Sequence, residues 1–266
     1  MSPATKTSTV ANARLTFGGA VRSELLKLTT MRSIWWITIV SIGLALMIML
    51  TSSPAGPEAG NESAWTVTHA SNGILMPWVI LAVYSALQAT GEWSSGMYRV
   101  SFTAVPNRNT WLAAKATAMA IYTGVVSILV LALSYAATLW KYSDLGATAD
   151  LAEAHTWQIF IGVPAVCIAT SIMAVGIGAL VKSSGIAVTA VVGLLAVLPF
   201  AGLFGLDWLA HITAYLPSGA GDSIIGAGSF GVTPDDIGPW VGSLVLLAWS
   251  VGACVAASVA MKGRDA

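Results

Sequence analysis

The chain has 266 residues, of which 56% are hydrophobic and only 9% charged, with twelve basic and twelve acidic side chains. A soluble domain carries about 25% charged residues, so this composition excludes an ordinary soluble enzyme, and its hydrophobicity excludes a disordered chain. The mean hydropathy of +0.78 indicates a membrane protein.

The N-terminal segment is polar and basic. Residues 1–12 are rich in Ser, Thr and Ala, and we expect them to be disordered. Residues 13–33 are expected to form an amphipathic helix in the cytoplasmic membrane interface, either as a functional element or as a plain anchoring linker. Its apolar residues recur on one helical face at Phe17, Val21, Leu25 and Leu28. Its charged residues of interest are Arg22, Glu24, Lys27 and Arg32.

Six stretches without Asp, Glu, Lys or Arg follow, each 24 to 29 residues long. A bilayer core about 30 Å thick needs about 20 apolar helical residues, so each stretch can cross once and none can cross twice. We therefore predict an all-α integral membrane protein with six transmembrane helices at about 34–52, 72–90, 113–139, 157–181, 185–204 and 239–261. No charged side chain is expected deep inside a span, because insertion there costs about 2.5–3.5 kcal/mol.

The distribution of basic residues predicts the orientation. Placing both termini in the cytoplasm puts eleven of the twelve Lys and Arg on the inner side and leaves only Lys141 outside. Residues 262–266 then form a cytoplasmic tail, and 91–112 form the longest inner loop. The outer segment 205–238 is long enough for a helix that dips into the outer leaflet and returns. Trp residues near predicted span ends, Trp78 and Trp111 among them, are expected at the interface.

Motifs for catalysis and metal binding are absent. The sequence has no HExxH, CxxC or GxSxG, and we expect no catalytic residue, metal site or cofactor in this chain. Residues 176–183 nearly match a phosphate-binding loop, but Val181 stands where the motif requires Gly. Cys167 and Cys254 are expected to be packing residues. The lack of intramembrane acids counts against an ion-coupled transporter.

The inner loop carries a more specific pattern, which reads Gly91-Glu92, Gly96, Arg99, Pro106-Asn107-Arg108 and Ala114-Lys115. This pattern resembles that of permease subunits of ATP-binding-cassette (ABC) exporters of the type-2 class. The opening residues 22–33 are also similar to the N-terminal segment of these subunits, and the resemblance covers essentially the whole chain. It departs at Met97-Tyr98, where small, β-branched or aliphatic residues are commoner.

The resemblance implies an assembly in a bacterial cytoplasmic (inner or plasma) membrane. Two six-helix permease subunits, identical or different, would form the pore, surrounded by membrane lipid. Two copies of a separate ATP-binding subunit would dock below and carry ATP and Mg. Nucleic acid is not expected as a partner. The cargo would be amphipathic or apolar, such as a drug, a peptide antibiotic or a lipid, with a role in antibiotic resistance or immunity.

The resemblance also implies roles for particular residues. The loop 91–112 would include the coupling helix that receives the ATPase motion, with Glu92, Gly96, Arg99, Pro106 and Arg108 as its residues. Glu92 is expected to pair with Arg99, with Arg108 or with a cation of the ATPase. The alternative for the basic residues, Lys115 included, is that they only set the topology.

The expected substrate path is apolar apart from a few polar positions. Helices two and five would line it, with Tyr84, Gln88 and Thr189 as its polar points. The alternative is that these three residues only bridge neighbouring helices. Two other function classes stay open, a stand-alone secondary transporter or channel and a non-transporting membrane anchor subunit.

Overall fold

The computed structural model describes residues 16–53, 56–57, 60–98, 101, 103, 107–148, 150–199, 207–226 and 237–263. Within these residues the regular structure is entirely helical, which confirms the all-α class. Five helical segments are long and apolar enough to cross a bilayer, as expected of an α-helical membrane protein. They are Arg32–Thr51, Glu62–Ser94, Arg108–Lys141, Ala154–Val181 and Pro239–Lys262.

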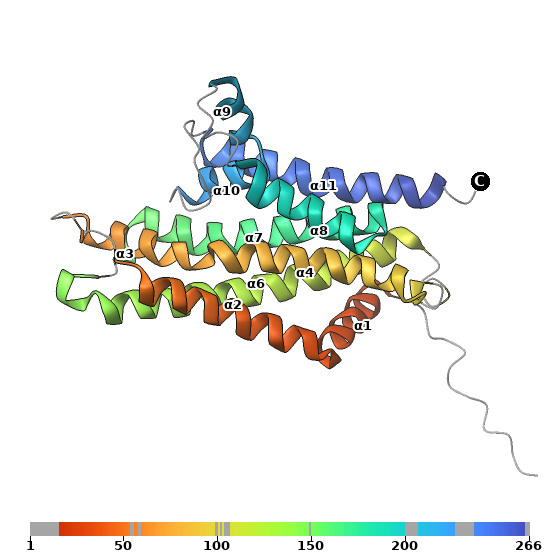
Figure 1. Ribbon diagram of the computed structural model, residues 1–266, viewed down its shortest axis with the longest axis horizontal. Helices are drawn as coiled ribbons and strands as arrows, with labels where there is room; N and C mark the ends of the chain where they lie inside the picture. The colour runs from red at the N-terminus through yellow and green to blue at the C-terminus, as the bar shows by residue number, and fades with distance from the viewer. Residues whose placement is uncertain are drawn as a thin grey trace, which may run out of the picture.

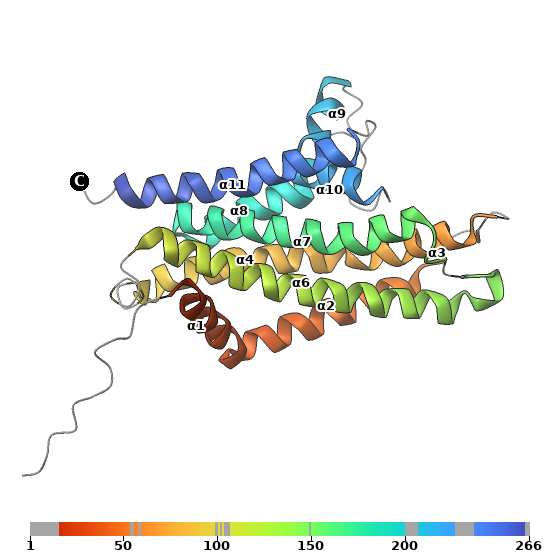
Figure 2. The ribbon, with the colours of Figure 1, turned by 180° about the vertical axis from the view of Figure 1, so that it is seen from behind.

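The long helices run side by side along the longest axis of the molecule (Figures 1 and 2). In chain order the elements are α1 (Phe17–Thr30), α2 (Arg32–Thr51), α3 (Glu62–Ser71), the 3-10 turn η2 (Asn72–Ile74), α4 (Leu75–Ser94), α6 (Arg108–Lys141), the 3-10 turn η3 (Ser143–Leu145), α7 (Ala154–Val181), α8 (Ser184–Val192), the π-helical turn η4 (Gly193–Val197), α9 (Asp207–Ala214), α10 (Pro217–Ile225) and α11 (Pro239–Gly263). The α1 end of the bundle holds α1, the end of α4, the start of α6 and the end of α11. The opposite, α3 end holds α3, α9 and α10.

The two ends carry charge of opposite sign. The element bounds place the charged residues. Of the described basic residues, only Lys141, at the end of α6, lies at the α3 end. The others lie on elements or element ends at the α1 end, and they are Arg22, Lys27, Arg32, Arg108, Lys115, Lys182 and Lys262. The acidic residues with described side chains are Glu24 and Glu92 at the α1 end, and Glu62, Asp144, Asp150, Glu153 and Asp222 at the α3 end. The separation expected from the sequence is therefore present in the described part of the fold.

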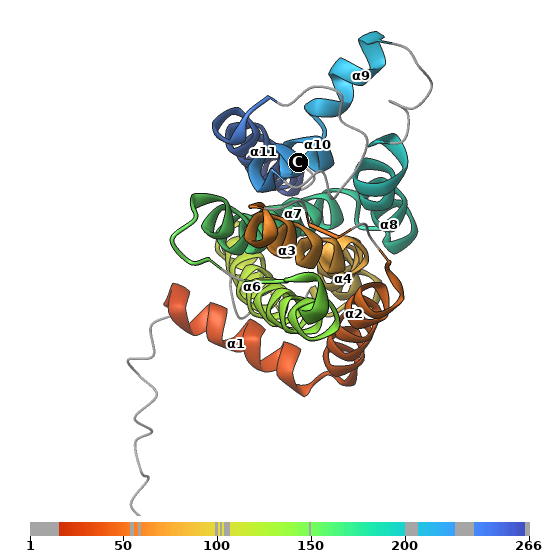
Figure 3. The ribbon, with the colours of Figure 1, turned by 90° about the vertical axis from the view of Figure 1, so that its left-hand side faces the viewer.

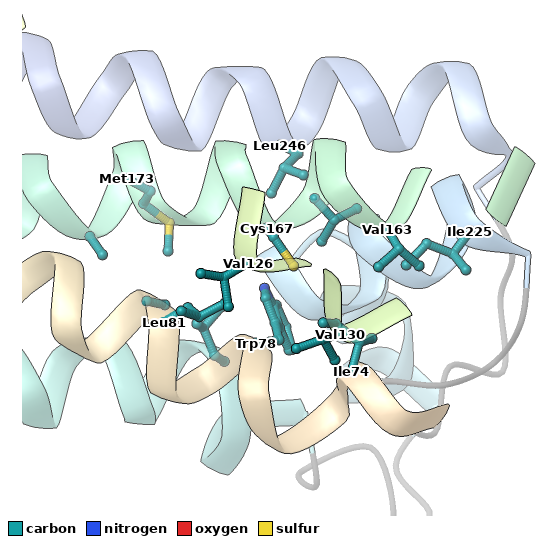
Figure 4. Close-up of a cluster of buried hydrophobic side chains, with 14 of the residues drawn as sticks. Ile74, Trp78, Leu81, Val126, Val130, Val163, Cys167, Met173, Ile225 and Leu246 are labelled. Carbon is teal, nitrogen blue, oxygen red and sulfur yellow. The ribbon is translucent and has the colours of Figure 1, made fainter. Parts of the chain in front are cut away.

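The core is built around α7, which packs against α4, α6 and α11 (Figure 3). Its apolar side chains interdigitate with those of the neighbouring helices, as Figure 4 shows around Trp78 and Cys167. The expected interfacial position of Trp78 is wrong, because this side chain is only 1% exposed. Its Nε1 donates a hydrogen bond to Thr170 Oγ1 at 2.9 Å, so the polar atom of the indole is satisfied inside the bundle. Cys167 and Cys254 are free thiols.

Glycines on α7 allow two neighbouring helices to approach closely. A Cβ atom at Gly178 would lie 2.6 Å from the carbonyl oxygen of Ala86, and one at Gly176 would lie 2.7 Å from the carbonyl carbon of Ala253. Such contacts are shorter than van der Waals packing permits. Packing through small residues is typical of membrane helices, since lipid provides no hydrophobic drive for their association.

We expect Gly178→Ala to destabilise the protein by about 1–3 kcal/mol, because the added methyl group forces α4 and α7 apart. Gly252→Ala is the matched control, since no atom lies within 4 Å of the position that its Cβ would take. In the control the better helix propensity of Ala should leave stability unchanged or slightly raised. Thermal unfolding of both variants in the same detergent measures the difference. Equal melting temperatures would contradict the close packing of α4 on α7.

Several boundaries differ from those expected from the sequence. The second expected span, 72–90, is part of a longer helical segment from Glu62 to Ser94. The inner loop is shorter than 91–112, because α4 continues to Ser94 and α6 begins at Arg108. The fifth expected span, 185–204, is described only as the shorter apolar helix Ser184–Val197. At 1.5 Å per residue its 14 residues span about 21 Å.

The outer segment contributes two short helices, α9 and α10. Nearly every described residue of α10 is buried, and this helix packs against α7, α9 and α11. Gly242 of α11 provides the close approach, because a Cβ there would lie 2.7 Å from the carbonyl oxygen of Ala220. Residues 227–236 of this segment lie outside the described residues. The described part therefore fills the α3 end between α7 and α11.

Candidate functional site

Four charged side chains from three helices meet at the α1 end. Glu24 and Lys27 come from α1, Glu92 from the last turn of α4, and Lys115 from the first turns of α6. We call these four residues the ion cluster. Glu24, Glu92 and Lys115 are 6%, 7% and 4% exposed, which is unusual for charged residues and requires close partners.

Helical spacing explains how the charges reach the interior. Ala20, Glu24 and Leu28 are all buried and recur every four residues, so they share the face of α1 that packs on the bundle. The predicted apolar stripe overlaps this face, because Leu28 belongs to both and Leu25 also packs against the core. Phe17, at the start of the helix, is 49% exposed.

The four charges alternate in sign. Lys115 Nζ lies 2.8 Å from Glu24 Oε2 and 2.8 Å from Glu92 Oε1. Lys27 Nζ lies 2.5 Å from Glu24 Oε1 and 3.3 Å from Glu92 Oε1. Each ammonium thus contacts both carboxylates, and the formal charge of the cluster is zero. Only such close multiple pairing makes the burial of charges tolerable.

Neutral donors complete the shell of Glu92. Ser101 Oγ donates to Glu92 Oε2 at 3.0 Å, and Trp111 Nε1 donates to the same oxygen at 3.1 Å. Lys115 Nζ also lies 5.6 Å from the centroid of the Trp111 ring, within the range of a cation–π contact. Trp111 is therefore buried in the cluster, and its expected interfacial position is wrong.

The carboxylates also act on Lys27, which is the most exposed member. Burial by itself lowers the pKa of Lys27, but the hydrogen bonds and negative charges of Glu24 and Glu92 outweigh that effect and raise the pKa above its usual value. Lys27 is therefore charged throughout the physiological pH range.

The chain turns directly after α4. Gly96 has a φ of +72°, a left-handed conformation that favours glycine and turns the chain. The rings of Trp93 and Tyr98 stack at 4.6 Å, and Lys182 Nζ lies 4.0 Å from the centroid of Trp93. Of the residues expected in coupling, Arg99 and Pro106 lie outside the described residues.

Arg108 is the first residue of α6, and its side chain contacts α11, the last helix of the chain. Its Nη1 donates to the carbonyl oxygen of Met261 at 2.6 Å, so the start of α6 is joined to the last turn of α11. A cation near a helix C-terminus stabilises the unpaired carbonyl groups there. The expected pairing of Glu92 with Arg108 is wrong, because the cations that contact Glu92 in the described part of the chain are Lys27 and Lys115.

Of the expected substrate-path residues, Tyr84 and Gln88 lie one helical turn apart on α4 with a hydrogen bond between their side chains, whereas Thr189 lies on another helix. The Tyr84 hydroxyl is 3.2 Å from Ser33 Oγ, and its ring meets Tyr122 edge-on at 5.8 Å. Thr189 is exposed on α8. Gln88 instead lines a cavity of about 460 Å³ beside the ion cluster. Arg22 and Arg32, expected in the interfacial helix, are both exposed.

Sequence reasoning missed Lys115, Trp111 and Ser101 as partners of Glu92. Trp111 and Lys115 are four residues apart, a spacing that places both on one face of α6. The only signal for Lys115 was its place in the resemblance pattern, and Ser101 had none. In the described residues no three His, Cys, Asp or Glu side chains come together as metal ligands.

No family model matches the sequence, and a search of the curated proteins finds no match. The function is therefore inferred from the geometry of the ion cluster and from the resemblance of the sequence to exporter permeases.

Proposed function

We propose that this chain is the transmembrane permease subunit of an ATP-driven ABC exporter in a bacterial cytoplasmic membrane. The observation that carries the proposal is the ion cluster. It joins α1 to the end of α4 and the start of α6, and these two helices flank the inner segment 95–107. A motor protein that docks on this segment would therefore push on three helices that are fixed to one another.

The physical argument concerns stiffness. Separating α1 from α4 and α6 would break the Lys27–Glu92 and Lys115–Glu24 contacts and leave each carboxylate with one ammonium instead of two, which opposes the separation. A displacement of the inner segment is consequently transmitted to the helices as a unit and is not absorbed by local bending. Arg108 extends the same connection to α11 through its bond to Met261.

We propose six membrane crossings with both termini in the cytoplasm. Thr90 Oγ1 and Ser184 Oγ lie 2.9 Å apart, so α8 starts beside the end of α4 at the α1 end. The next long helix, α11, starts at the α3 end, and α8 with η4 makes the intervening crossing. The basic residues gathered at the α1 end favour its cytoplasmic placement.

The proposed partners follow from this role. Two copies of a separate ATP-binding subunit would bind ATP and Mg and dock at the α1 end, while this chain carries out no catalysis. A second permease, identical or different, would complete the pore. The cargo would be a drug, a peptide antibiotic or a lipid, as the resemblance implies, because α4 and the described α8, the expected lining of the path, are mostly apolar.

Purification in a mild detergent followed by mass spectrometry of the associated subunits tests the proposal. We expect a nucleotide-binding subunit whose MgATP hydrolysis changes when this chain is present. Transport by the isolated chain in liposomes without ATP would instead identify a stand-alone transporter or channel. Recovery with another membrane protein, without an ATPase and without transport, would identify an anchor subunit. Either of these results would overturn the proposal.

A further inference from the structure

The cavity beside the ion cluster has the properties of a ligand site. Its volume of about 460 Å³ lies within the range of small-molecule pockets. It is bounded by α1 on one side and by the end of α4 on the other, with Met97 of the following turn at its edge. Its apolar side chains are Leu28, Met31, Leu87 and Met97. Its polar side chains are the four residues of the ion cluster with Thr30, Gln88 and Ser95. An amphiphile, which has both an apolar and a charged part, is complementary to such a lining.

The polar wall is the ion cluster itself. All four of its charged side chains line the cavity. The Lys27 side chain is 37% exposed, whereas the side chains of Glu24 and Glu92 are each 8% exposed. An ammonium has three N–H donors, and the described contacts of Lys27 use two of them. The amide of Gln88 adds a further neutral polar group.

The apolar wall opens to the surroundings of the bundle. Met31, Leu87 and Met97 line the cavity and are 42%, 37% and 49% exposed. Nearby on α2, Trp35 and Trp36 are 62% and 67% exposed. Exposed Trp side chains at the start of a membrane helix lie at headgroup level. In the orientation of the proposed function, the cavity would open near the headgroup level of the leaflet at the α1 end.

We propose that this cavity binds phosphatidylethanolamine from the cytoplasmic leaflet. The phosphate would accept a hydrogen bond from Lys27, and the primary ammonium of the headgroup would donate to Glu24, whose two oxygens each accept from one lysine in the described contacts. The first acyl methylenes would lie along Leu87 and Met97. The site is neutral, and it presents both signs of charge within one small volume, which matches a zwitterion that carries N–H donors.

Charge complementarity discriminates this lipid from others. An anionic headgroup without an amine would place its phosphate near the two carboxylates and form no hydrogen bond with Glu24. A choline headgroup also has no N–H to donate to Glu24, so it forgoes the additional hydrogen bond that a primary ammonium forms. The assignment of the leaflet rests on the orientation in the proposed function, but the binding itself requires no ATPase.

Native mass spectrometry of the purified full-length chain tests the proposal. Phosphatidylethanolamine, phosphatidylcholine and phosphatidylglycerol with identical acyl chains are added separately to the protein in maltoside detergent. We expect one phosphatidylethanolamine to bind with an affinity about tenfold above that of the other two lipids, the effect of one or two charge-assisted hydrogen bonds. Water-soluble glycerophosphoethanolamine, which lacks acyl chains, should bind more weakly.

Two variants and one control assign binding to this cavity. Lys27→Gln removes the exposed ammonium, and Leu87→Trp fills the cavity from an exposed position without changing a charge. Both should reduce phosphatidylethanolamine binding about tenfold, whereas Lys262→Gln, an exposed position on α11, should leave it unchanged. Equal binding of the three lipids would overturn the proposal. So would full binding to the folded Leu87→Trp variant, or equally tight binding of the soluble headgroup.

Discussion

Replacing Lys115 with methionine is expected to lower the free energy of unfolding by about 3–5 kcal/mol, the usual cost of leaving buried charges without their partner. Lys115 is the least exposed member of the ion cluster and contacts both carboxylates at 2.8 Å. Without it, two carboxylates share the single ammonium of Lys27. Chemical denaturation in detergent micelles, followed by tryptophan fluorescence, measures the loss.

A second substitution separates the charge effect from lost packing. Glu24→Gln alone should also destabilise the protein, but in the Lys115→Met background it should recover part of the stability, because one carboxylate then faces one ammonium. Lys262→Met is the matched control, since this exposed lysine has no described partner in the cluster. Additive losses from Glu24→Gln and Lys115→Met would show that the two residues do not interact.

If the chain is the proposed exporter permease, charge reversal at Arg108 is expected to reduce cargo-stimulated ATP hydrolysis of the complex with its ATPase about fivefold, equivalent to roughly 1 kcal/mol of coupling free energy. The guanidinium joins the start of α6 to the Met261 carbonyl in the last turn of α11. A glutamate there repels that carbonyl and releases the end of α11 from the start of α6. The basal ATPase rate and the amount of inserted protein should be unchanged.

Lys262→Glu provides the control for this experiment, because it reverses a charge one residue beyond Met261 without breaking the bond to Arg108. Equal stimulation in Arg108→Glu and in the control would rule out a coupling role for Arg108. Glu92 is a poorer choice for the same test. Its carboxylate is buried among Lys27, Lys115, Ser101 and Trp111, so reversal there would destabilise the bundle as well.

The helical class and the long spans could be predicted from the sequence. Burying a charge in lipid is costly, so membrane spans appear as long stretches without charged residues. The gaps between charged residues locate Arg32–Thr51, Ala154–Val181 and Pro239–Lys262 within a few residues. The same reasoning misses the parts of a helix that extend beyond the charge-free stretch into polar sequence. The extension of α4 past Glu92 and the start of α6 at Arg108 are examples.

The site could be predicted only in part. The resemblance pattern drew attention to Glu92 and Arg108, but their partners depend on how α1, α4 and α6 pack, and local sequence does not encode that arrangement. The stripe of apolar residues on α1 predicted an amphipathic helix, but it did not predict that Leu28 would pack in the protein core. The burial of Glu24 depends on its contact with Lys115 of α6, which the sequence of α1 does not reveal.

The ion cluster also constrains the order in which the protein is assembled during synthesis. Glu24 and Lys27 are three residues apart and can pair as soon as α1 forms. Lys115, however, follows Glu24 by 91 residues, which a ribosome adds in about 5–18 s. Until then the surface on which α1 packs carries Glu92 without Lys115, its buried partner. We therefore expect α1 to reach its final position only after α6 has begun to emerge from the ribosome.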